Sequence, residues 1–527
     1  MNSPKSASPK AETASPGPPW PPGPWVPDYA VEPVRDGEDS ASGTRSEEAR
    51  LVFSDWMGRP VSLYARRSYP LREANGAAVL HIVGGAQTIL PGDLSVWTDE
   101  GYAAAGFDWQ ISGVGGRPPE RTSRFPDGAV AQFSPTPSLA AAVLPVAAQA
   151  AAVCLHWLAR CPGVDGGRLG VTGISWGGYL AWLLAAYDSR VRALVPVFAC
   201  GGLFAEGRPV ADHAPEVRAF WQRHWEPAAL GPRIQAPVCY LNGTNDFFGD
   251  PLVAERLLAS LRVPVARGYL PNVDHSLSAA QTVLAKAWMR KHLLDGPDLP
   301  APPEPQAPKC GGSSDAYWWA DAEGPSMYRC WLPGVPPPDR RAFVFANRTL
   351  PGGAVLSSPI RTFEATEDGH PADPADPLGS FLPFGLGWRW ELGGSRHFSN
   401  DARATAPASA NAPWAVVPAR PKSGEAVTVL LHLSPQAVRM LPSGSSLILG
   451  WSAPPQDAVV TVEIHGRDPA RGTCKASFPW RDGAISLTLE GVPTLPADFT
   501  WADVGRLHIS ARQERRPFEV GPLCVGD

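Results

Sequence analysis

A serine flanked by glycines stands between two apolar runs in the segment RLGVTGISWGGYLAWLLAAYD, which spans residues 168–188. Ser175 has Gly173 two residues before it and Gly177 two residues after it, and Gly178 extends the pattern. A turn that exposes a serine between a strand and a helix must be tight, and glycine permits the close backbone approach that such a turn needs. A glycine-flanked serine alone is more often part of an ordinary turn, so the rest of the chain decides whether Ser175 is a nucleophile that attacks an acyl carbonyl.

A serine hydroxyl is a poor nucleophile at neutral pH, so it needs a base within hydrogen-bond reach and a carboxylate that orients the base. We expect both partners downstream, at strand ends. Asp246 ends the run VCYLNGTND, and His275 ends the run GYLPNVDH just before the closing helix. Asp250 and Asp274 are competing acids. We rank Asp246 first, because adjacent side chains in an extended loop tend to diverge and Asp250 lies where the next helix starts.

The attacked carbonyl oxygen becomes an oxyanion, which backbone N–H groups must stabilise. One donor is expected from Trp176, directly after the serine. The other is expected from the glycine-rich loop after the strand in VLHIVGG, where Gly85 and Ala86 are the candidates. Losing one such donor raises the barrier by about 3 kcal/mol in comparable sites. The residues that shape this turn are His81, Gly84 and Gln87.

Residues 32–298 alternate short β-rich runs with longer helical runs, which is typical of a mostly parallel, doubly wound α/β sheet with helices on both faces. The expected strands lie in RLVFSDWMGRPVSLYARRSYP, AAVLHIVGG, YAAAGFDWQIS, RLGVTGIS, VRALVPVFACGG, APVCYLNGTND and VARGYLPNVDH. The expected helices lie at residues 138–159 and 177–187, and in PLVAERLLASL and LSAAQTVLAKAWMRKHLLD. This order places the serine, the acid and the histidine at strand ends of one domain.

An insertion at residues 203–231 follows a strand end, and its position suggests a cap over a pocket. It contains His213 and His224. These two side chains reach the serine only if the insertion folds over the site.

The chain on either side of this catalytic region differs from it in composition. Residues 1–31 are rich in proline and serine, which predicts a disordered tail. Residues 299–308 lie in GPDLPAPPEPQAP, which is typical of a semi-rigid proline linker. Beyond the linker, short strands between Pro, Gly and Asp turns predict a small β-sandwich over 309–370 and a larger one over 371–527. The run ATEDGHPADPADPLGS, residues 365–380, separates the two.

The composition indicates several domains with a tryptophan-rich interior or binding surface. The chain has 527 residues, of which 44% are hydrophobic and 20 are tryptophan. Its 46 basic and 51 acidic residues give a net charge of −5 with no basic block, so nucleic acid is not an expected partner. The one membrane-like segment, 138–159, is dominated by alanine and interrupted by Pro145, Gln149 and His156. We expect a buried helix there and no membrane partner.

The spacing of the cysteines and the composition of the first residues lead to expectations about cofactors and about the cellular location of the protein. The eight cysteines are spread thinly without metal-ligand spacing, so we interpret them as reduced core residues. Neither a metal nor an organic cofactor is expected. The start of the chain lacks the apolar core of a secretory signal, which favours a cytoplasmic location.

These motifs resemble those of the α/β-hydrolases, and within them the dienelactone hydrolase, acetylxylan esterase and prolyl-oligopeptidase-like group, over about residues 52–294. The stretch VDGGRLGVTGISWGGYLAWLLAAYDSRVRALVPV resembles the nucleophile region of the group, LNGTNDFF its acid loop, LPNVDHS its histidine loop and HIVGGAQT its oxyanion loop. The resemblance implies an α/β-hydrolase fold and the same roles for Ser175, Asp246 and His275. Ile82 and Val83 depart from the more glycine- and histidine-rich loop of the group.

Two downstream stretches also carry resemblances. FVFANRTLPGGAVLSSPI looks like a small immunoglobulin-like appendage, and FTWADVGRLHISA is similar to the last strands of jelly-roll carbohydrate-binding modules. Exposed tryptophans in such a module would stack on sugar rings of a polysaccharide, although most tryptophans in a sandwich form the core. The candidates are Trp388, Trp390, Trp414, Trp451, Trp480 and Trp501.

The sequence therefore predicts a serine hydrolase that cleaves a carboxylic ester through an acyl-enzyme, with an acyl or acetyl ester of a carbohydrate as the favoured substrate. Two alternatives remain open. One is a peptidase of the prolyl-oligopeptidase type, although no β-propeller precedes the catalytic region. The other is a binding or scaffold protein with a catalytically dead hydrolase domain, in which the tryptophan-rich sandwiches hold a polymer or a protein.

Overall fold

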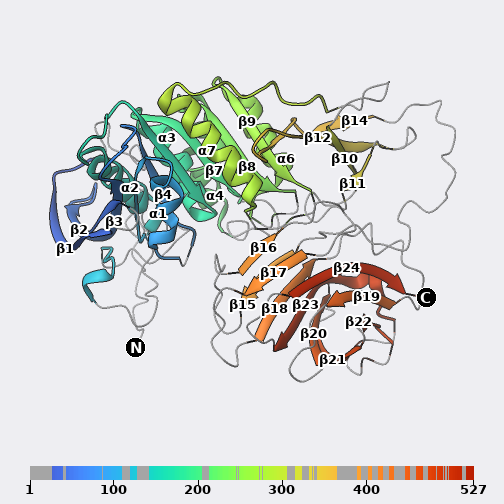
Figure 1. Cartoon of the computed structure of the whole chain (residues 1–527). Coiled ribbons are helices and arrows are strands. Elements are labelled where there is room, and N and C mark those ends of the chain that lie inside the picture. Colours follow the sequence, from blue (N-terminus) through green and yellow to red (C-terminus); the bar gives the residue numbers. More distant parts are fainter. Residues whose placement is uncertain are drawn as a thin grey trace, which may run out of the picture.

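The computed structural model places three β sheets along the chain (Figure 1). It describes the chain except for residues 1–25, 40–42, 86, 110–118, 127–141, 204–212, 245, 247, 272, 274, 276, 306–314, 323–330, 335, 337–340, 365–387, 393–401, 406–413, 419–425, 433–445, 452–458, 467–472, 482, 491, 493, 494, 496, 497, 513–517 and 527. For most strand residues at 388–451 and 505–526 only the backbone course is described.

The first sheet contains nine described strands in the order β1-β2-β3-β5-β4-β6-β7-β8-β9. They are β1 (Tyr29–Asp39), β2 (Thr44–Ser54), β3 (Pro60–Pro70), β4 (Ala78–Ile82), β5 (Ala103–Phe107), β6 (Leu169–Ile174), β7 (Val191–Val197), β8 (Val238–Gly243) and β9 (Val265–Leu270). Along the order β1-β2-β3-β5, each neighbouring pair is antiparallel. From β5 onward, in the order β5-β4-β6-β7-β8-β9, each neighbouring pair is parallel. The carboxyl ends of the parallel strands therefore meet at one edge of the sheet.

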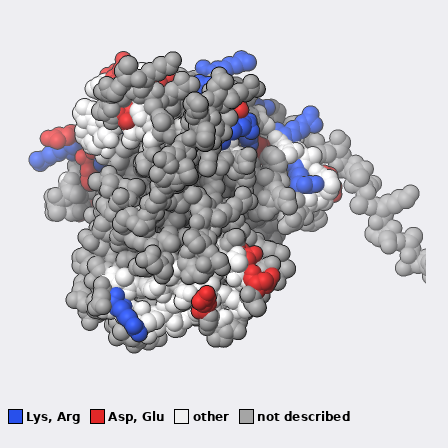
Figure 2. All heavy atoms as spheres, turned by 90° about the vertical axis from the view of Figure 1, so that its right-hand side faces the viewer, with Lys and Arg blue, Asp and Glu red and all other residues white. Residues whose placement is uncertain are grey.

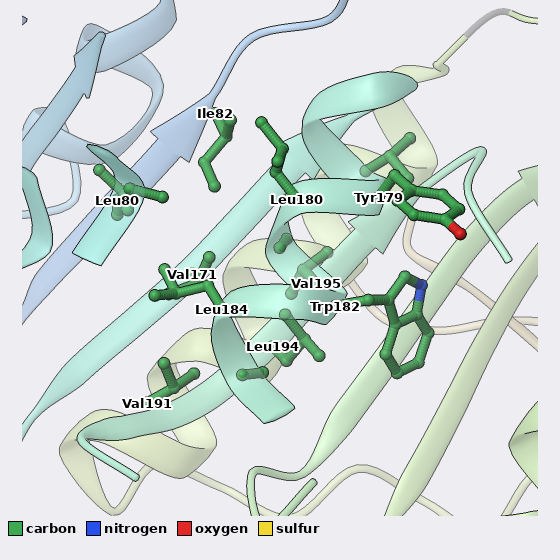
Figure 3. Close-up of a cluster of buried hydrophobic side chains, with 14 of the residues drawn as sticks. Leu80, Ile82, Val171, Tyr179, Leu180, Trp182, Leu184, Val191, Leu194 and Val195 are labelled. Carbon is green, nitrogen blue, oxygen red and sulfur yellow. The ribbon is translucent and has the colours of Figure 1, made fainter. Parts of the chain in front are cut away.

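Helices cover both faces of this sheet (Figure 1). They are α1 (Pro91–Thr98), α2 (Val143–Ala159), α3 (Trp176–Tyr187), α4 (Pro215–His224), α5 (Pro227–Leu230), α6 (Pro251–Ser260) and α7 (Ala279–Leu294). Short 3-10 turns lie at Pro119–Arg121 and Gly231–Arg233 in this region, and at Trp501–Asp503 before the third sheet's strand β23 (Val504–Arg512). A Cβ on Gly170 of β6 would meet Met289 of α7, and the next residue, Val171, belongs to the cluster with α3 (Figure 3). Because neighbouring side chains of a strand point to opposite faces, α3 and α7 cover opposite sides.

One part of the hydrophobic core lies between the central strands and α3 (Figure 3). Leu80 and Val171 from the sheet and Leu180 and Leu184 from α3 are fully buried there. Replacing one such leucine with alanine destabilises a protein by about 2–5 kcal/mol. A mostly parallel sheet, helices on both faces and the strand-turn-helix at Ser175 make this an α/β-hydrolase fold, as the sequence predicts.

Two elements of this region differ from the sequence predictions. Strand β1 starts at Tyr29, so it overlaps the end of the predicted tail, and its long pairing with β2 is antiparallel. Charged residues and proline are common in edge strands, which have one exposed side. Because β1 contains many of them, its sequence shows no hydrophobic pattern that would predict a strand. Helix α1 also has no predicted counterpart, since its eight residues are too few for a clear helical period.

A second sheet follows the segment that the sequence predicts as a linker. Its order is β11-β10-β12-β13, with β14 paired to β12. The strands are β10 (Ala316–Asp321), β11 (Leu332–Pro333), β12 (Ala342–Thr349), β13 (Val355–Ser357) and β14 (Arg361–Phe363). Strand β13 lies against β9, where the Tyr269 N–H donates to Ser357 Oγ at 2.7 Å and Asn347 Nδ2 donates to the Tyr269 carbonyl at 3.0 Å. This small sheet therefore covers the outer edge of the first.

The third sheet contains ten described strands, and all its pairs are antiparallel. They are β15 (Trp388–Leu392), β16 (Ala402–Thr405), β17 (Trp414–Pro418), β18 (Ala426–His432), β19 (Ser446–Trp451), β20 (Val459–Gly466), β21 (Thr473–Arg481), β22 (Ala484–Leu487), β23 (Val504–Arg512) and β24 (Phe518–Gly526). The downstream region is thus rich in β structure. The immunoglobulin-like and jelly-roll classes remain predictions, and the separating run 365–380 lies outside the described residues.

Two findings concern the described residues as a whole. None of their helices is long and apolar enough to cross a membrane. Figure 2 shows basic and acidic side chains together on the described part of one face, which agrees with the mixed charge of the sequence.

Candidate active site

The turn at Ser175 leaves no room for larger residues at two of its glycines. Ser175 lies between β6 and α3 with φ 58° and ψ −121°. A Cβ on Gly173 would lie 2.1 Å from the carbonyl oxygen of Gly177, and a Cβ on Gly177 would lie 2.1 Å from the carbonyl oxygen of Ile82. Real Cβ atoms essentially never come closer than 3.0 Å to such atoms, so both positions require glycine. The strand, the helix and the end of β4 are pressed together around the serine.

Ser175 is held in a backbone conformation that non-glycine residues rarely adopt. Its N–H donates to the carbonyl of Val197 on β7 at 2.9 Å, and its carbonyl accepts the N–H of Tyr179 in α3 at 3.0 Å. Such a conformation raises the energy by about 1–3 kcal/mol and persists where the surrounding structure forces it. The turn places the serine at the carboxyl edge of the parallel strands, with 7% of the residue exposed.

Asp246 and His275 are joined directly. The Nδ1 atom of His275 lies 2.7 Å from Oδ2 of Asp246, and Asp246 is fully buried. The second carboxylate oxygen, Oδ1, accepts the N–H groups of Phe248 at 2.7 Å and Gly249 at 2.6 Å. A carboxylate beside Nδ1 keeps the proton on that nitrogen, so Nε2 is the basic atom of the ring. The pair has the geometry of a base and its orienting acid.

The start of α7 fixes the loop that carries His275. Ser278 caps the helix by accepting the N–H of Gln281 at 3.2 Å. The Gln281 amide then donates to the carbonyls of Asn242 in β8 at 3.0 Å and Gly268 in β9 at 2.8 Å. The loop therefore runs between a strand and a helix that are both tied to β8, the strand that ends before Asp246.

The competing residues have other contacts. The Asp250 carboxylate accepts the N–H groups of Leu252 at 2.8 Å and Val253 at 3.3 Å, so it caps α6. Asp274 lies outside the described residues. His224, in α4, packs its ring against Phe220 of the same helix, with centroids 4.8 Å apart.

Aromatic rings connect the serine end of the site to the histidine. The ring of Trp176, directly after the serine, meets the ring of Phe248 with centroids 4.9 Å apart. The same Phe248 ring lies 6.2 Å from the His275 imidazole, and the Phe198 ring lies 4.4 Å from it. Ser175, Asp246 and His275 thus come from turns and loops at one edge of the sheet, and the Phe248 ring links the residue after the serine to the histidine. Phe198 has no sequence signal, because it follows β7 as one more apolar residue.

The predicted oxyanion loop is only partly described. The Gly84 N–H donates to Gln87 Oε1 at 2.9 Å, and the Asp108 carboxylate accepts from Thr88 Oγ1 at 2.7 Å and the Ile89 N–H at 2.8 Å. These bonds brace the loop around Gly85, whereas Ala86 lies outside the described residues. Trp176 is the first residue of α3, where backbone N–H groups lack partners within the helix. The oxyanion roles of these three residues remain predictions.

His81 belongs to the opposite face from α3. Its Nδ1 accepts the indole N–H of Trp97 in α1 at 3.4 Å. Burial lowers the pKa of the His81 imidazole, with a smaller opposing effect of the Asp93 carboxylate. The ring therefore supports β4 against α1.

The described part of the insertion packs onto α3. The Tyr179 hydroxyl donates to the Trp225 carbonyl at 2.7 Å and accepts from the Trp221 indole at 2.8 Å. Glu226 Oε1 accepts the N–H of Gly202, just after β7, at 2.7 Å. Burial raises the pKa of the Glu226 carboxyl to about 7. Whether the insertion caps a pocket stays a prediction, since residues 204–212 lie outside the described chain.

A cavity of about 840 Å³ lies at the amino edge of the sheet, away from these residues. It is lined by Arg67, Arg190, Trp157 and the segment around Tyr29. The Arg67 guanidinium is paired with Glu47, and the Arg190 guanidinium with Asp188. Both arginine charges are therefore neutralised by carboxylates of the protein itself.

Metal ligands and disulfides do not occur in the described part of the chain. No group of three or more His, Cys, Asp or Glu side chains there is placed to hold a metal ion. The cysteines with described side chains are buried and free of disulfides: Cys154, Cys161, Cys200, Cys239 and Cys474.

Residues 138–283 match the dienelactone hydrolase family. This segment is a dienelactone hydrolase family domain. It begins just before α2 and contains Ser175, Asp246 and His275. Gly85 precedes the matched segment of the dienelactone hydrolase domain, as do β1 to β5, and both downstream sheets follow it.

Comparison with solved structures finds distant similarity to several hydrolases of known structure. Acetyl xylan esterase 1 from Thermoanaerobacterium sp. JW/SL YS485 is 18% identical over 50% of this chain and 87% of its own, with a TM-score of 0.38. The acetyl xylan esterase from Paenibacillus sp. R4 is 18% identical over 50% and 89%, with a TM-score of 0.38. A puromycin-hydrolyzing peptidase of Mycobacterium tuberculosis is 17% identical over 50% and 47%, with a TM-score of 0.35. No curated protein matches the chain.

Proposed function

We propose that this chain is a serine hydrolase that cleaves carboxylic esters. The observation that carries the proposal is the buried Asp246–His275 hydrogen bond of 2.7 Å at the sheet edge where Ser175 occupies a strained turn. A serine on such a turn and an imidazole oriented by a carboxylate are the parts that acyl transfer requires. The dienelactone hydrolase domain that contains all three residues supports the same reaction class.

In the first half of the reaction, Ser175 Oγ attacks the ester carbonyl while Nε2 of His275 takes the hydroxyl proton. Asp246 holds the imidazole in the required tautomer and stabilises the imidazolium. The N–H groups of Trp176 and of Gly85 or Ala86 are the proposed donors to the oxyanion. The tetrahedral intermediate collapses, the C–O bond breaks, and His275 returns the proton to the departing alcohol. The acyl group is left on Ser175.

In the second half, water replaces the alcohol. His275 takes a proton from the water as its oxygen attacks the acyl-enzyme carbonyl, and the same oxyanion donors stabilise the new intermediate. Collapse of this intermediate breaks the bond to Ser175 Oγ, which regains its proton from His275. The carboxylic acid leaves, and the enzyme returns to its initial state. Residues of the chain perform every step.

The proposed substrate is an ester with a short acyl group. The Trp176 ring, directly after Ser175, packs against the Phe248 ring, which in turn meets the His275 imidazole, and such bulk beside the reacting atoms favours acetyl over long chains. A carbohydrate as the alcohol part rests on the resemblance of the downstream strands to sugar-binding modules. Among the tryptophan candidates, Trp501 is buried and is not available for stacking, whereas Trp480 is half-buried. The side chains of the other four lie outside the described residues.

A fluorophosphonate probe and a Ser175→Ala variant test the reaction class. We expect the wild-type chain to be labelled and to hydrolyse p-nitrophenyl acetate faster than the butyrate, and the folded variant to lose both labelling and turnover. A folded wild type without labelling would support the scaffold alternative. Cleavage of an aminoacyl-proline amide in preference to the esters would support the peptidase alternative. Either result would overturn the proposal.

The polysaccharide part of the proposal has its own test. The full Ser175→Ala chain is incubated with insoluble polysaccharides, and the bound fraction is compared with that of the same chain carrying Trp480→Ala. We expect binding that the second change reduces. If the Ser175→Ala chain does not bind any polysaccharide of the series, the carbohydrate assignment is wrong.

A further inference from the structure

Phe198 has a backbone conformation that a phenylalanine rarely adopts. Its φ is 64°, in the region that favours glycine. The described non-glycine residues with positive φ are Glu73, Ser175, Phe198 and Asp295. Of these, Ser175 and Phe198 lie in the candidate active site. Two glycines, Gly201 and Gly202, follow shortly after in the chain. Strained residues persist where the surroundings force them, and they cluster at functional sites.

The backbone of Phe198 is fixed from two sides. Its N–H donates to the carbonyl of Leu241 in β8 at 2.9 Å. Its own carbonyl lies so close to Gly249 that a Cβ on Gly249 would come within 2.4 Å of the oxygen. Gly249 also donates its N–H to Asp246 Oδ1. The Phe198 peptide is therefore wedged between β8 and the loop of the acid.

The ring of Phe198 faces the imidazole. The two ring centroids are 4.4 Å apart with the planes tilted by 39°, and Phe198 is 2% exposed. Phe248 meets the same imidazole edge-on at 6.2 Å and 82°. A hydrogen bond at Nδ1 does not by itself set the plane of an imidazole ring. Packing by Phe198 over the ring face restricts that plane.

We infer that Phe198 is a positioning residue that fixes the plane of the His275 imidazole, and that the positive φ is what turns its phenyl ring onto the imidazole. The inference rests on the proposed function. A misplacement of about 1 Å in a catalytic group lowers a rate by as much as 10²-fold, whereas substrate binding does not depend on the tilt of the imidazole. Loss of the ring should therefore lower kcat and leave KM unchanged.

Phe198→Leu removes the ring and keeps much of its bulk. We expect its kcat on p-nitrophenyl acetate to fall by about 10- to 100-fold with KM within about twofold of the wild type. Phe53→Leu is the matched control, because Phe53 is a buried phenylalanine on β2, far along the sheet from the site. It is expected to lower the melting temperature and leave kcat unchanged. Phe198→Gly is a second variant, which suits the positive φ and is expected to lose at least as much kcat.

A spectroscopic measurement separates positioning from general loosening. The Nδ1 proton of His275, bonded to a carboxylate, is expected downfield of the backbone amides in a ¹H NMR spectrum. We expect this signal to be sharp in Phe53→Leu and broadened in both Phe198 variants. The inference is wrong if a folded Phe198 variant keeps a wild-type kcat and a sharp signal while Ser175→Ala is inactive. If Ser175→Ala itself remains active, the proposed function fails and the inference fails with it.

Discussion

One carboxylate oxygen of Asp246 bonds to His275, and the other is held by the backbone. Oδ2 lies 2.7 Å from Nδ1 of the imidazole, while Oδ1 is held by the backbone N–H groups of Phe248 and Gly249. The two backbone bonds prevent the carboxylate from rotating away. The orientation of the base is therefore set by the loop after β8 as much as by the aspartate itself.

Asp246→Asn tests this arrangement. The shape of the side chain is kept, but an amide that donates to Nδ1 stabilises the wrong imidazole tautomer, so kcat on p-nitrophenyl acetate should fall by about 10³- to 10⁴-fold. Asp250→Ala is the control from the same loop. It removes the cap of α6 and should lower the free energy of unfolding by about 1 kcal/mol with kcat unchanged. A larger kcat loss in Asp250→Ala than in Asp246→Asn would make Asp250 the acid.

Gly177→Ala should damage stability and activity together. The new Cβ would overlap the carbonyl oxygens of Ile82 and Val83, so α3 must move away from the end of β4. We expect urea denaturation to show a loss of about 1–3 kcal/mol or more, and hydrolysis to fall because the predicted oxyanion loop starts there. Gly166→Ala is the control, since a Cβ there meets nothing within 4 Å. Equal stability of the two variants would contradict the observed crowding.

Glu226 should make stability depend on pH. Burial raises the pKa of its carboxyl from 4.5 to about 7, so the folded state binds a proton that the unfolded state releases. Its contribution is complete below pH 4.5 and is lost as the pH rises to about 7, which lowers the free energy of unfolding by about 3 kcal/mol. Urea denaturation at pH 5 and pH 8 measures most of this loss, about 2.5 kcal/mol.

Glu226→Gln isolates the effect, because its neutral amide has nothing to titrate. The difference in unfolding free energy between the variant and the wild type should shift in favour of the variant from pH 5 to pH 8. Glu216→Gln, on the exposed side of α4, should follow the wild-type curve. Parallel curves for Glu226→Gln and the wild type would show that the carboxyl is not buried in solution.

Ser357→Ala should weaken the junction of the two sheets. The Tyr269 N–H would lose its acceptor in a buried position, which lowers the free energy of unfolding by about 1–3 kcal/mol. Ser189→Ala, at an exposed serine, should have no measurable effect. Urea denaturation of both full-length variants decides the matter, and a Ser357→Ala chain as stable as the wild type would mean that the contact is open in solution.

The sequence and the structure agree best where local backbone chemistry decides the outcome. The glycines around Ser175 indicate a tight turn because they have no Cβ, and the apolar runs before Asp246 and His275 indicate buried parallel strands. Phe198 carries no such mark, because its role depends on a backbone angle and on a ring from another loop. The contact of Tyr269 with Ser357 was equally hidden, since it joins residues that lie far apart in the chain.

The covering of β9 by β13 also sets an order of events during synthesis. The partner of the Tyr269 N–H is 88 residues further along the chain. At about 5–20 residues per second, a nascent chain carries an open β9 edge for roughly 4–18 s before Ser357 is made. Unpaired strand edges pair with other chains, so the β9 edge of the growing polypeptide is exposed to aggregation during this interval.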